Sequence, residues 1–423
     1  MLAKTVTVVK STARWTLSLP ASPWAAHLIG EPLFRLMGLR DRGRELCLSK
    51  VKRVLVVRLD EIGDVIMTTP FLHELRQNLP KTWITLLVKP EIYNLVELCP
   101  SVNEVLVYNW RAHRYLVSFI RQWRALRLAR KSLWQRHFDL CILPRWDVDG
   151  YHATFLAYFS GARWRVGYSE IVSDCKQRHS NGLDCLLTHV LHGNTVKHEV
   201  EHNLDVIRFL GGTVREECLE LWLSPEDEAF AKQVLSLHGV KDDSVLVSFG
   251  PGAGAPKRMW PLSNFVELGA WLKQEVNAHL VVVGGEGEEP LGQELQRQLG
   301  DRVINLVGQT TLRQTGALLK RCYLYVGNDA GPMHLAAAAG IPVIEISCHP
   351  LGGSPLHANS PRRFGPWRVP HRVLQPETAV DPCVDACTAA RAHCILGVAP
   401  ERAIEAIAAQ LSRQRGCVSL KEV

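Results

Sequence analysis

The stretch VGNDAGPMHLA (326–336) joins an apolar run to a run of small residues. The apolar run, 322–328, predicts a buried strand, and the residues from the proline to Gly340 predict a helix, because proline suits the first helical turn and glycine often follows the last. Three residues fall in the turn between them: Asp329, Ala330 and Gly331. Free N–H groups at such a helix start favour an anion such as a diphosphate, which His334 could also reach. Alternatively, Asp329 only caps the helix and His334 only packs.

The same alternation of strand and helix runs along most of the chain. Strand-like apolar runs cover 53–58, 82–88, 104–108 and 139–144, and the pattern restarts at 244–250, 279–285, 302–308, 322–328 and 341–347. A single helix is expected over 64–79. The pattern predicts an α/β fold of two Rossmann-like, doubly wound parallel-sheet domains that face a cleft. A length of 423 residues also favours two domains.

Domain limits follow from this pattern. We expect an N-terminal domain over 51–225 and a C-terminal domain over 240–375, with a hinge between about 223 and 243. A cysteine-containing tail with a final helix would cover 376–423. Residues 1–50 form a separate extension, which is either a helical segment packed on the body or a basic amphipathic segment on a membrane surface.

Composition limits the classes of function. The formal net charge of +7 is too small to predict nucleic-acid binding, but it would tolerate an anionic partner or a membrane surface. Twelve scattered cysteines favour a reduced, cytoplasmic protein. We identify neither a secretory signal nor an apolar run of about 18 residues that would span a bilayer.

Two further turns follow predicted strands. In GPGAGAPKRMWP (250–261), glycines including Gly252 would let the backbone approach a ligand, and Lys257 and Arg258 supply positive charge. In RLDEIGDVIMTTP (58–70), Gly63 lets the chain turn and presents Asp64. A carboxylate there suits a general base, although the acids of this turn could equally be helix-start residues favoured by the dipole.

Three segments together resemble glycosyltransferase family 9, the heptosyltransferase family of lipopolysaccharide core assembly. They are VLVVRLDEIGDVIMTTPFLHELR (54–76), PGAGAPKRMWPLSNFVELGAWL (251–272) and VGNDAGPMHLAAAAGIPVI (326–344). The resemblance extends from about Val54 to about Ala408 and implies a GT-B fold, with the donor in the C-terminal domain. It also implies inverting transfer from ADP-heptose to an anionic glycolipid at the inner membrane, without a cofactor or catalytic metal.

The resemblance assigns roles to individual residues. Asp64 matches the general base, and either Lys257 or Arg258 would neutralise the departing ADP. The turn residues Asp329, Ala330 and Gly331, with His334, would hold the phosphates and the neighbouring sugar. Glu286 matches a residue placed for the ribose hydroxyls, or it is a solvated loop acid.

Two features lie outside these motifs. Residues 111–136 are rich in arginine and contain no acid; Arg121 and Arg124 belong to a basic helical stripe that either contacts an anionic acceptor at the membrane or is a solvated face. Cys383, Cys387, His393 and Cys394 could form a tetrahedral zinc site. Because two neighbours in sequence rarely face one metal together, ordinary packing is the favoured interpretation.

Other functions stay open. An epimerase on the same scaffold would release free sugar without an acceptor, and a non-catalytic protein would bind the nucleotide sugar without turnover. The sequence fixes neither the nucleotide base nor the sugar, the acceptor or the oligomeric state.

Overall fold

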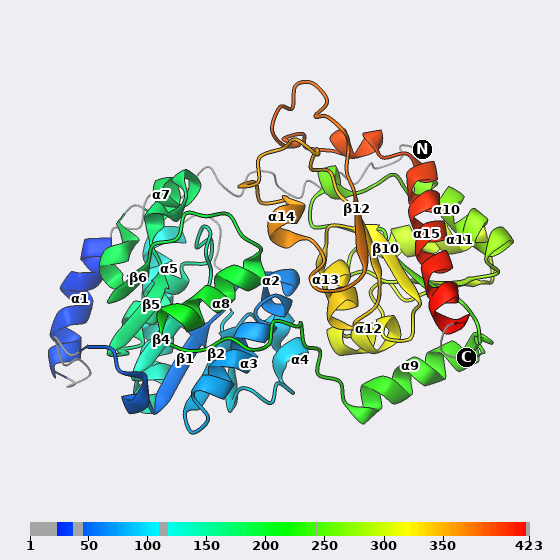
Figure 1. Ribbon diagram of the computed structural model, residues 1–423. Helices are drawn as coiled ribbons and strands as arrows, with labels where there is room; N and C mark the ends of the chain where they lie inside the picture. Colours follow the sequence, from blue (N-terminus) through cyan, green and yellow to red (C-terminus); the bar gives the residue numbers. More distant parts are fainter. Residues whose placement is uncertain (1–22, 37–44, 110–116, 181, 242, 420–423) are drawn as a thin grey trace, which may run out of the picture.

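The computed structural model describes residues 23–36, 45–109, 117–180, 182–241 and 243–419, and these form two α/β domains side by side (Figure 1). The start of the arginine-rich range, 111–116, and the predictions on 1–22, 37–44 and 420–423 lie outside the described residues. Each domain contains a six-stranded sheet in which every pairing is parallel.

The first sheet has the order β3-β2-β1-β4-β5-β6 and the second the order β12-β11-β10-β7-β8-β9. When the strands of each domain are numbered from its own first strand, both sheets have the doubly wound order 3-2-1-4-5-6; the second is read from its β9 edge. The first sheet comprises β1 (Arg53–Val57), β2 (Trp83–Val88), β3 (Glu104–Val107), β4 (Leu140–Leu143), β5 (Trp164–Tyr168) and β6 (His189–Leu191). The second comprises β7 (Leu246–Gly250), β8 (His279–Val282), β9 (Val303–Asn305), β10 (Leu324–Asn328), β11 (Val343–Ile346) and β12 (His371–Leu374).

The sequence therefore predicted the fold class and nine of these strands correctly. The three that it missed, β5, β6 and β12, are short or contain polar residues and glycine, as in WRVGY and HRVL. Their apolar signal is weak because packing and pairing, rather than composition, hold them in the sheet.

Helices cover both faces of each sheet. In the first domain they are α2 (Ile62–Ile66), α3 (Thr69–Asn78), α4 (Tyr93–Val96), α5 (Val117–Leu128), α6 (Ala153–Phe159), α7 (Asp174–Ser180) and α8 (Glu199–Phe209). In the second they are α9 (Pro225–Leu237), α10 (Leu262–Glu275), α11 (Glu289–Leu299), α12 (Leu312–Leu319), α13 (Gly331–Ala338), α14 (Pro361–Phe364) and α15 (Pro400–Ser419). Strands buried on both faces explain the nearly continuous apolar runs of the sequence.

The single helix predicted over 64–79 is wrong, because the chain breaks into α2 and α3. Pro70 has no backbone N–H to donate and would clash inside a helix, so it stands in the first turn of α3 instead. This break gives α2 its own direction at the end of β1.

The segments between and beyond the domains pack on them. In the range predicted for the hinge, α9 contacts α12 of the second domain. The residues before α9 run along α3 of the first domain, where the Glu220 N–H donates to Thr69 Oγ1 at 2.9 Å.

The final helix α15 packs against α10 and crosses the second domain in Figure 1. Helix α1 (Pro23–Leu36) packs against α6 through Phe34, whose ring meets Tyr158 edge to face. In the part of the chain described, no helix is both long and apolar enough to span a bilayer.

Candidate functional site

The first half of the site lies where β1 passes into α2. Glu61 and Asp64 form a reciprocal capping box, in which the Glu61 N–H donates to Asp64 Oδ2 at 3.2 Å. The Thr68 hydroxyl donates to the Asp64 carbonyl at 2.7 Å. The Asp64 side chain keeps 15% of its surface exposed, so its carboxylate is held firmly while remaining accessible.

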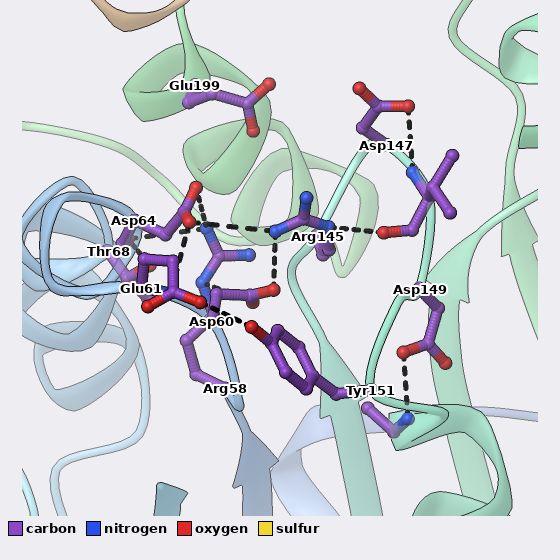
Figure 2. Close-up of polar contacts among 12 residues, drawn as sticks. Arg58, Asp60, Glu61, Asp64, Thr68, Arg145, Asp147, Asp149, Tyr151 and Glu199 are labelled. Atoms are coloured by element: carbon purple, nitrogen blue, oxygen red, sulfur yellow. Dashed lines mark hydrogen bonds and ion pairs between the residues drawn. The ribbon is translucent and has the colours of Figure 1, made fainter. Parts of the chain in front are cut away.

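Two arginines lie beside this carboxylate (Figure 2). Arg58, completely buried at the end of β1, places Nη2 3.8 Å from Asp64 Oδ1 and Nε 3.2 Å from Asp60. Arg145, just beyond β4, pairs with Asp60 and lies 3.8 Å from Asp64 Oδ2. Asp60 thus binds both guanidinium groups closely, and Asp64 is the acid that is left with longer contacts to them.

The second half lies where β10 passes into α13. Arg258 Nη1 is 3.3 Å from Asp329 Oδ2, directly before the helix start. Asp329 does not cap the helix: its N-cap is Ala330, which has no side-chain cap. Lys257 points elsewhere and donates to the Cys387 carbonyl at 2.8 Å. Of the two basic residues, Arg258 is therefore the one that lies at the N-terminal end of α13, where free N–H groups favour an anion.

The two halves meet. A Cβ added to Gly63 would lie 2.3 Å from His334 Cδ2 and 2.7 Å from its Nε2, so the ring is packed against the bare glycine backbone. On the other side, a Cβ at Gly331 would lie 3.2 Å from Ile62. Figure 1 shows α2 and α13 adjoining at the middle of the molecule. Burial lowers the pKa of His334 although Asp329 and Asp64 oppose this, so the ring is neutral near pH 7.

The glycine-rich turn after β7 lies against another acid. A Cβ at Gly252 would lie 2.3 Å from the Glu288 carboxylate, which also accepts the Gly285 N–H at 2.8 Å. Glu286, two residues earlier, is exposed. Sequence reasoning did not single out Glu288, although it follows the same strand.

A buried arginine joins the domains above this junction. Arg363, in α14, donates to Glu199 Oε1 of α8 at 2.6 Å and to Asp147 Oδ2 at 2.8 Å. Burial raises the pKa of both carboxyls, but the charges of Arg363 and Arg145 and the hydrogen bonds from Arg363 together outweigh it and hold each pKa below its usual value. His198, the N-cap of α8, stacks on Trp367 and adds a second contact between the domains.

A pocket opens beside the Asp60 cluster at the carboxyl ends of β1, β4 and β5. Its polar lining includes Asp60, Arg145, Asp147, Asp149, Tyr151 and Lys176. The Lys176 amine donates to the carbonyls of Trp146 and Tyr168, and burial lowers its pKa to about 8. The pocket therefore presents carboxylates, the Arg145 guanidinium and the Lys176 amine to a polar ligand.

Two predicted features lie away from this junction. Arg124 is half-buried on α5, with Arg127 exposed on the same helix, while the Arg121 side chain is outside what the structure describes. In the tail, the ligand atoms of Cys383, Cys387, His393 and Cys394 all lie within 4.8 Å of one another. The expectation that His393 and Cys394 do not face one point is therefore wrong.

Comparison with known proteins identifies the family of the chain. The family model "Glycosyltransferase family 9 (heptosyltransferase)" matches residues 126–392, more than half of the chain. The chain belongs to glycosyltransferase family 9. It is therefore a glycosyltransferase with the GT-B fold.

Individual relatives are distant but nearly full-length. The lipopolysaccharide core heptosyltransferase OpsX of Haemophilus influenzae is 20% identical over 79% of this chain and 95% of its own. A family 9 glycosyltransferase structure from Veillonella parvula superposes with a TM-score of 0.72 at 22% identity, over 88% of this chain and all of its own. The structure of Escherichia coli ADP-heptose lipopolysaccharide heptosyltransferase II gives a TM-score of 0.61 at 21% identity, over 86% and 99%.

Sequence reasoning missed the arginines that surround the acids. Arg58 directly follows β1 and Arg145 follows β4, and both positions are at the carboxyl edge where ligands of such sheets bind. That position is a usable signal. Arg363 carries no comparable signal, since its partners lie 164 and 216 residues away.

Proposed function

We propose that the chain is an inverting glycosyltransferase that moves a heptose from ADP-heptose to an acceptor of the lipopolysaccharide core. The observation that carries the proposal is the contact of Gly63 with His334, which sets Asp64 of one domain beside the helix start at Gly331 of the other. A base and a diphosphate site then flank one reacting centre, as glycosyl transfer requires.

At the donor end, the leaving diphosphate needs positive charge. Arg258 and the free N–H groups at the start of α13 supply it, so the proposed reaction uses no catalytic metal. Because Arg258 pairs with Asp329 only at 3.3 Å, it can exchange this partner for phosphate. Glu286 and Glu288 are the candidates for the ribose hydroxyls, and the contact of Glu288 with Gly252 favours Glu288. ADP-heptose is proposed because the similar Escherichia coli heptosyltransferase is named for it.

At the acceptor end, Asp64 is the general base. It takes the proton from the acceptor hydroxyl while that oxygen attacks the anomeric carbon. The bond from this carbon to the β-phosphate oxygen breaks, and ADP leaves on the opposite face, which inverts the configuration. Arg58 and Arg145 orient the Asp64 carboxylate without a close ion pair, since each is 3.8 Å from it.

The acceptor proposal is an anionic glycolipid. The pocket next to Asp60 is lined by carboxylates as well as by Arg145 and Lys176, so it suits the hydroxyl groups of the acceptor sugar, which both donate and accept hydrogen bonds. The exposed basic residues Arg127, in the last turn of α5, and Arg130, just after it, suit the anionic surface of the inner face of the inner membrane, where such a lipid is anchored.

The test measures ADP release by the purified protein from ADP-heptose, with and without an inner-core acceptor, and assigns the anomeric configuration of the product by NMR. Release that requires acceptor and inverts the anomeric carbon supports the proposal. Retention of configuration would refute the single-displacement role of Asp64. Turnover of a UDP- or GDP-sugar in preference would refute the ADP-heptose assignment.

A further inference from the structure

The tail after β12 brings three thiols and one imidazole together without any role in the proposed reaction. They belong to Cys383, Cys387, His393 and Cys394. Among the described residues, these four bring their ligand atoms close enough together to hold one metal ion. The three cysteines are 4%, 1% and 0% exposed. Other buried cysteines, such as Cys141 and Cys322, fill the sheet cores singly.

The spacing of the atoms matches a coordination tetrahedron. His393 Nδ1 lies 3.7 Å from Cys383 Sγ and 3.6 Å from Cys394 Sγ. Zinc–sulfur bonds of about 2.3 Å and zinc–nitrogen bonds of about 2.0 Å at tetrahedral angles place sulfur and nitrogen about 3.5 Å apart. The two observed edges, which share His393 Nδ1, therefore correspond to three ligands of one ion.

The surroundings also suit metal-bound thiolates. The Thr388 N–H donates to Cys383 Sγ at 3.3 Å, a contact that orients and stabilises a thiolate ligand. The short helix η8 (Cys394–Gly397) begins directly after His393, and this turn directs two neighbouring side chains to one point. Ordinary apolar packing of cysteines does not require an imidazole nitrogen among the sulfurs.

We propose that Cys383, Cys387, His393 and Cys394 bind one zinc ion as a closed, structural Cys3His site. Four protein ligands leave no open position, so the ion would take no part in the transfer. Zinc is the ion that this mixture of thiolate and imidazole favours under reducing conditions.

The site would stabilise the loops around the donor. The Cys387 carbonyl accepts the Lys257 amine at 2.8 Å, next to Arg258, and the Asp385 carbonyl accepts the Ser354 N–H at 2.8 Å. The segment between the first two cysteines is thus tied to the basic turn after β7 and to the loop after β11. Loss of the ion should loosen both of these loops and thereby weaken ADP binding. The expected effect on ADP binding rests on the proposed donor site.

The test is the metal content of the full-length protein purified under reducing conditions, measured by inductively coupled plasma mass spectrometry. We expect about one zinc ion per chain, lost in Cys383→Ser and in His393→Ala. Cys175→Ser is the matched control, because Cys175 is an exposed thiol outside the cluster, and it should retain the ion. Stoichiometric iron in place of zinc would overturn the zinc assignment.

A second measurement does not depend on the folding of a variant. Cobalt(II) added to the metal-stripped wild-type protein should produce the thiolate charge-transfer and intense visible bands of tetrahedral coordination. Absence of these bands, or a disulfide between two of the three cysteines in the freshly purified protein, would overturn the proposal. Neither readout involves the sugar donor, so the site can be tested even if the proposed transferase reaction fails.

Discussion

The contact between Gly63 and His334 predicts that Gly63→Ala will damage activity far more than folding. The added Cβ would lie 2.3 Å from His334 Cδ2, whereas unstrained carbon contacts are about 3.5 Å, so the ring or the domain must move by about 1.2 Å. Misplacement of a reacting group by about 1 Å can cost about 10²-fold in rate. Overpacking of this kind costs about 1–3 kcal/mol of stability.

The assay compares kcat/KM for acceptor-dependent ADP release with the free energy of unfolding in urea. We expect kcat/KM to fall by about 10²-fold while the protein stays folded. Gly193→Ala is the control, because its Cβ would make only an ordinary 3.8 Å contact with Tyr168.

A double variant separates the clash from other effects. In Gly63→Ala/His334→Ala the ring is absent, so the alanine at position 63 should cause no further loss beyond that of His334→Ala alone. Gly63→Ala with the kcat/KM of wild type would refute the packing argument. A double variant much less active than His334→Ala would refute it as well.

Three more predictions follow from the same contacts. Arg258→Gln should lower kcat/KM by about 10²–10³-fold, because it removes a positive charge from the proposed diphosphate site. A loss of less than tenfold in a steady-state kinetic assay would show that Arg258 does not have that role. Arg363→Met should lower the free energy of unfolding in urea by about 3–5 kcal/mol, since it leaves the buried carboxylates of Glu199 and Asp147 without their arginine partner. A decrease of less than about 1 kcal/mol would contradict this prediction. Burial lowers the pKa of His202 from its ordinary value of 6.5 to about 4. Between these two values the unfolded chain binds more protons than the folded protein, so the free energy of unfolding should fall as the pH falls from 7 to 5. This residue should contribute about 2 kcal/mol to that fall. Urea unfolding of His202→Phe should show a smaller fall over that pH range, and an unchanged fall would count against the assignment.

Much of the fold could be predicted because strands buried on both faces produce long apolar runs. The positions of candidate residues such as Asp64 and Asp329 could be predicted, because each lies in a turn that follows such a run. The partners of these residues could not be predicted, because they come from other strands or from the other domain. Arg145 reaches Asp60 across 85 residues, and no local pattern encodes that contact.

The tail shows a different kind of failure. Sequence spacing suggested that His393 and Cys394 face different ways, as neighbours in a regular strand do. The chain is irregular there, with φ −146° and ψ −86° at His393, and this conformation brings both side chains to the same cluster. Rules based on the periodicity of regular elements do not apply to such a loop.

The central claim is that Asp64 removes the acceptor proton. The most direct test measures kcat for transfer by Asp64→Asn at saturating ADP-heptose and acceptor, with ADP affinity measured by calorimetry on the same preparation. Asparagine has the same shape and can still accept the Glu61 N–H, so the capping contact should survive. We predict a fall in kcat of about 10²–10⁴-fold with unchanged ADP affinity. Transfer at the wild-type rate by folded Asp64→Asn would contradict the account.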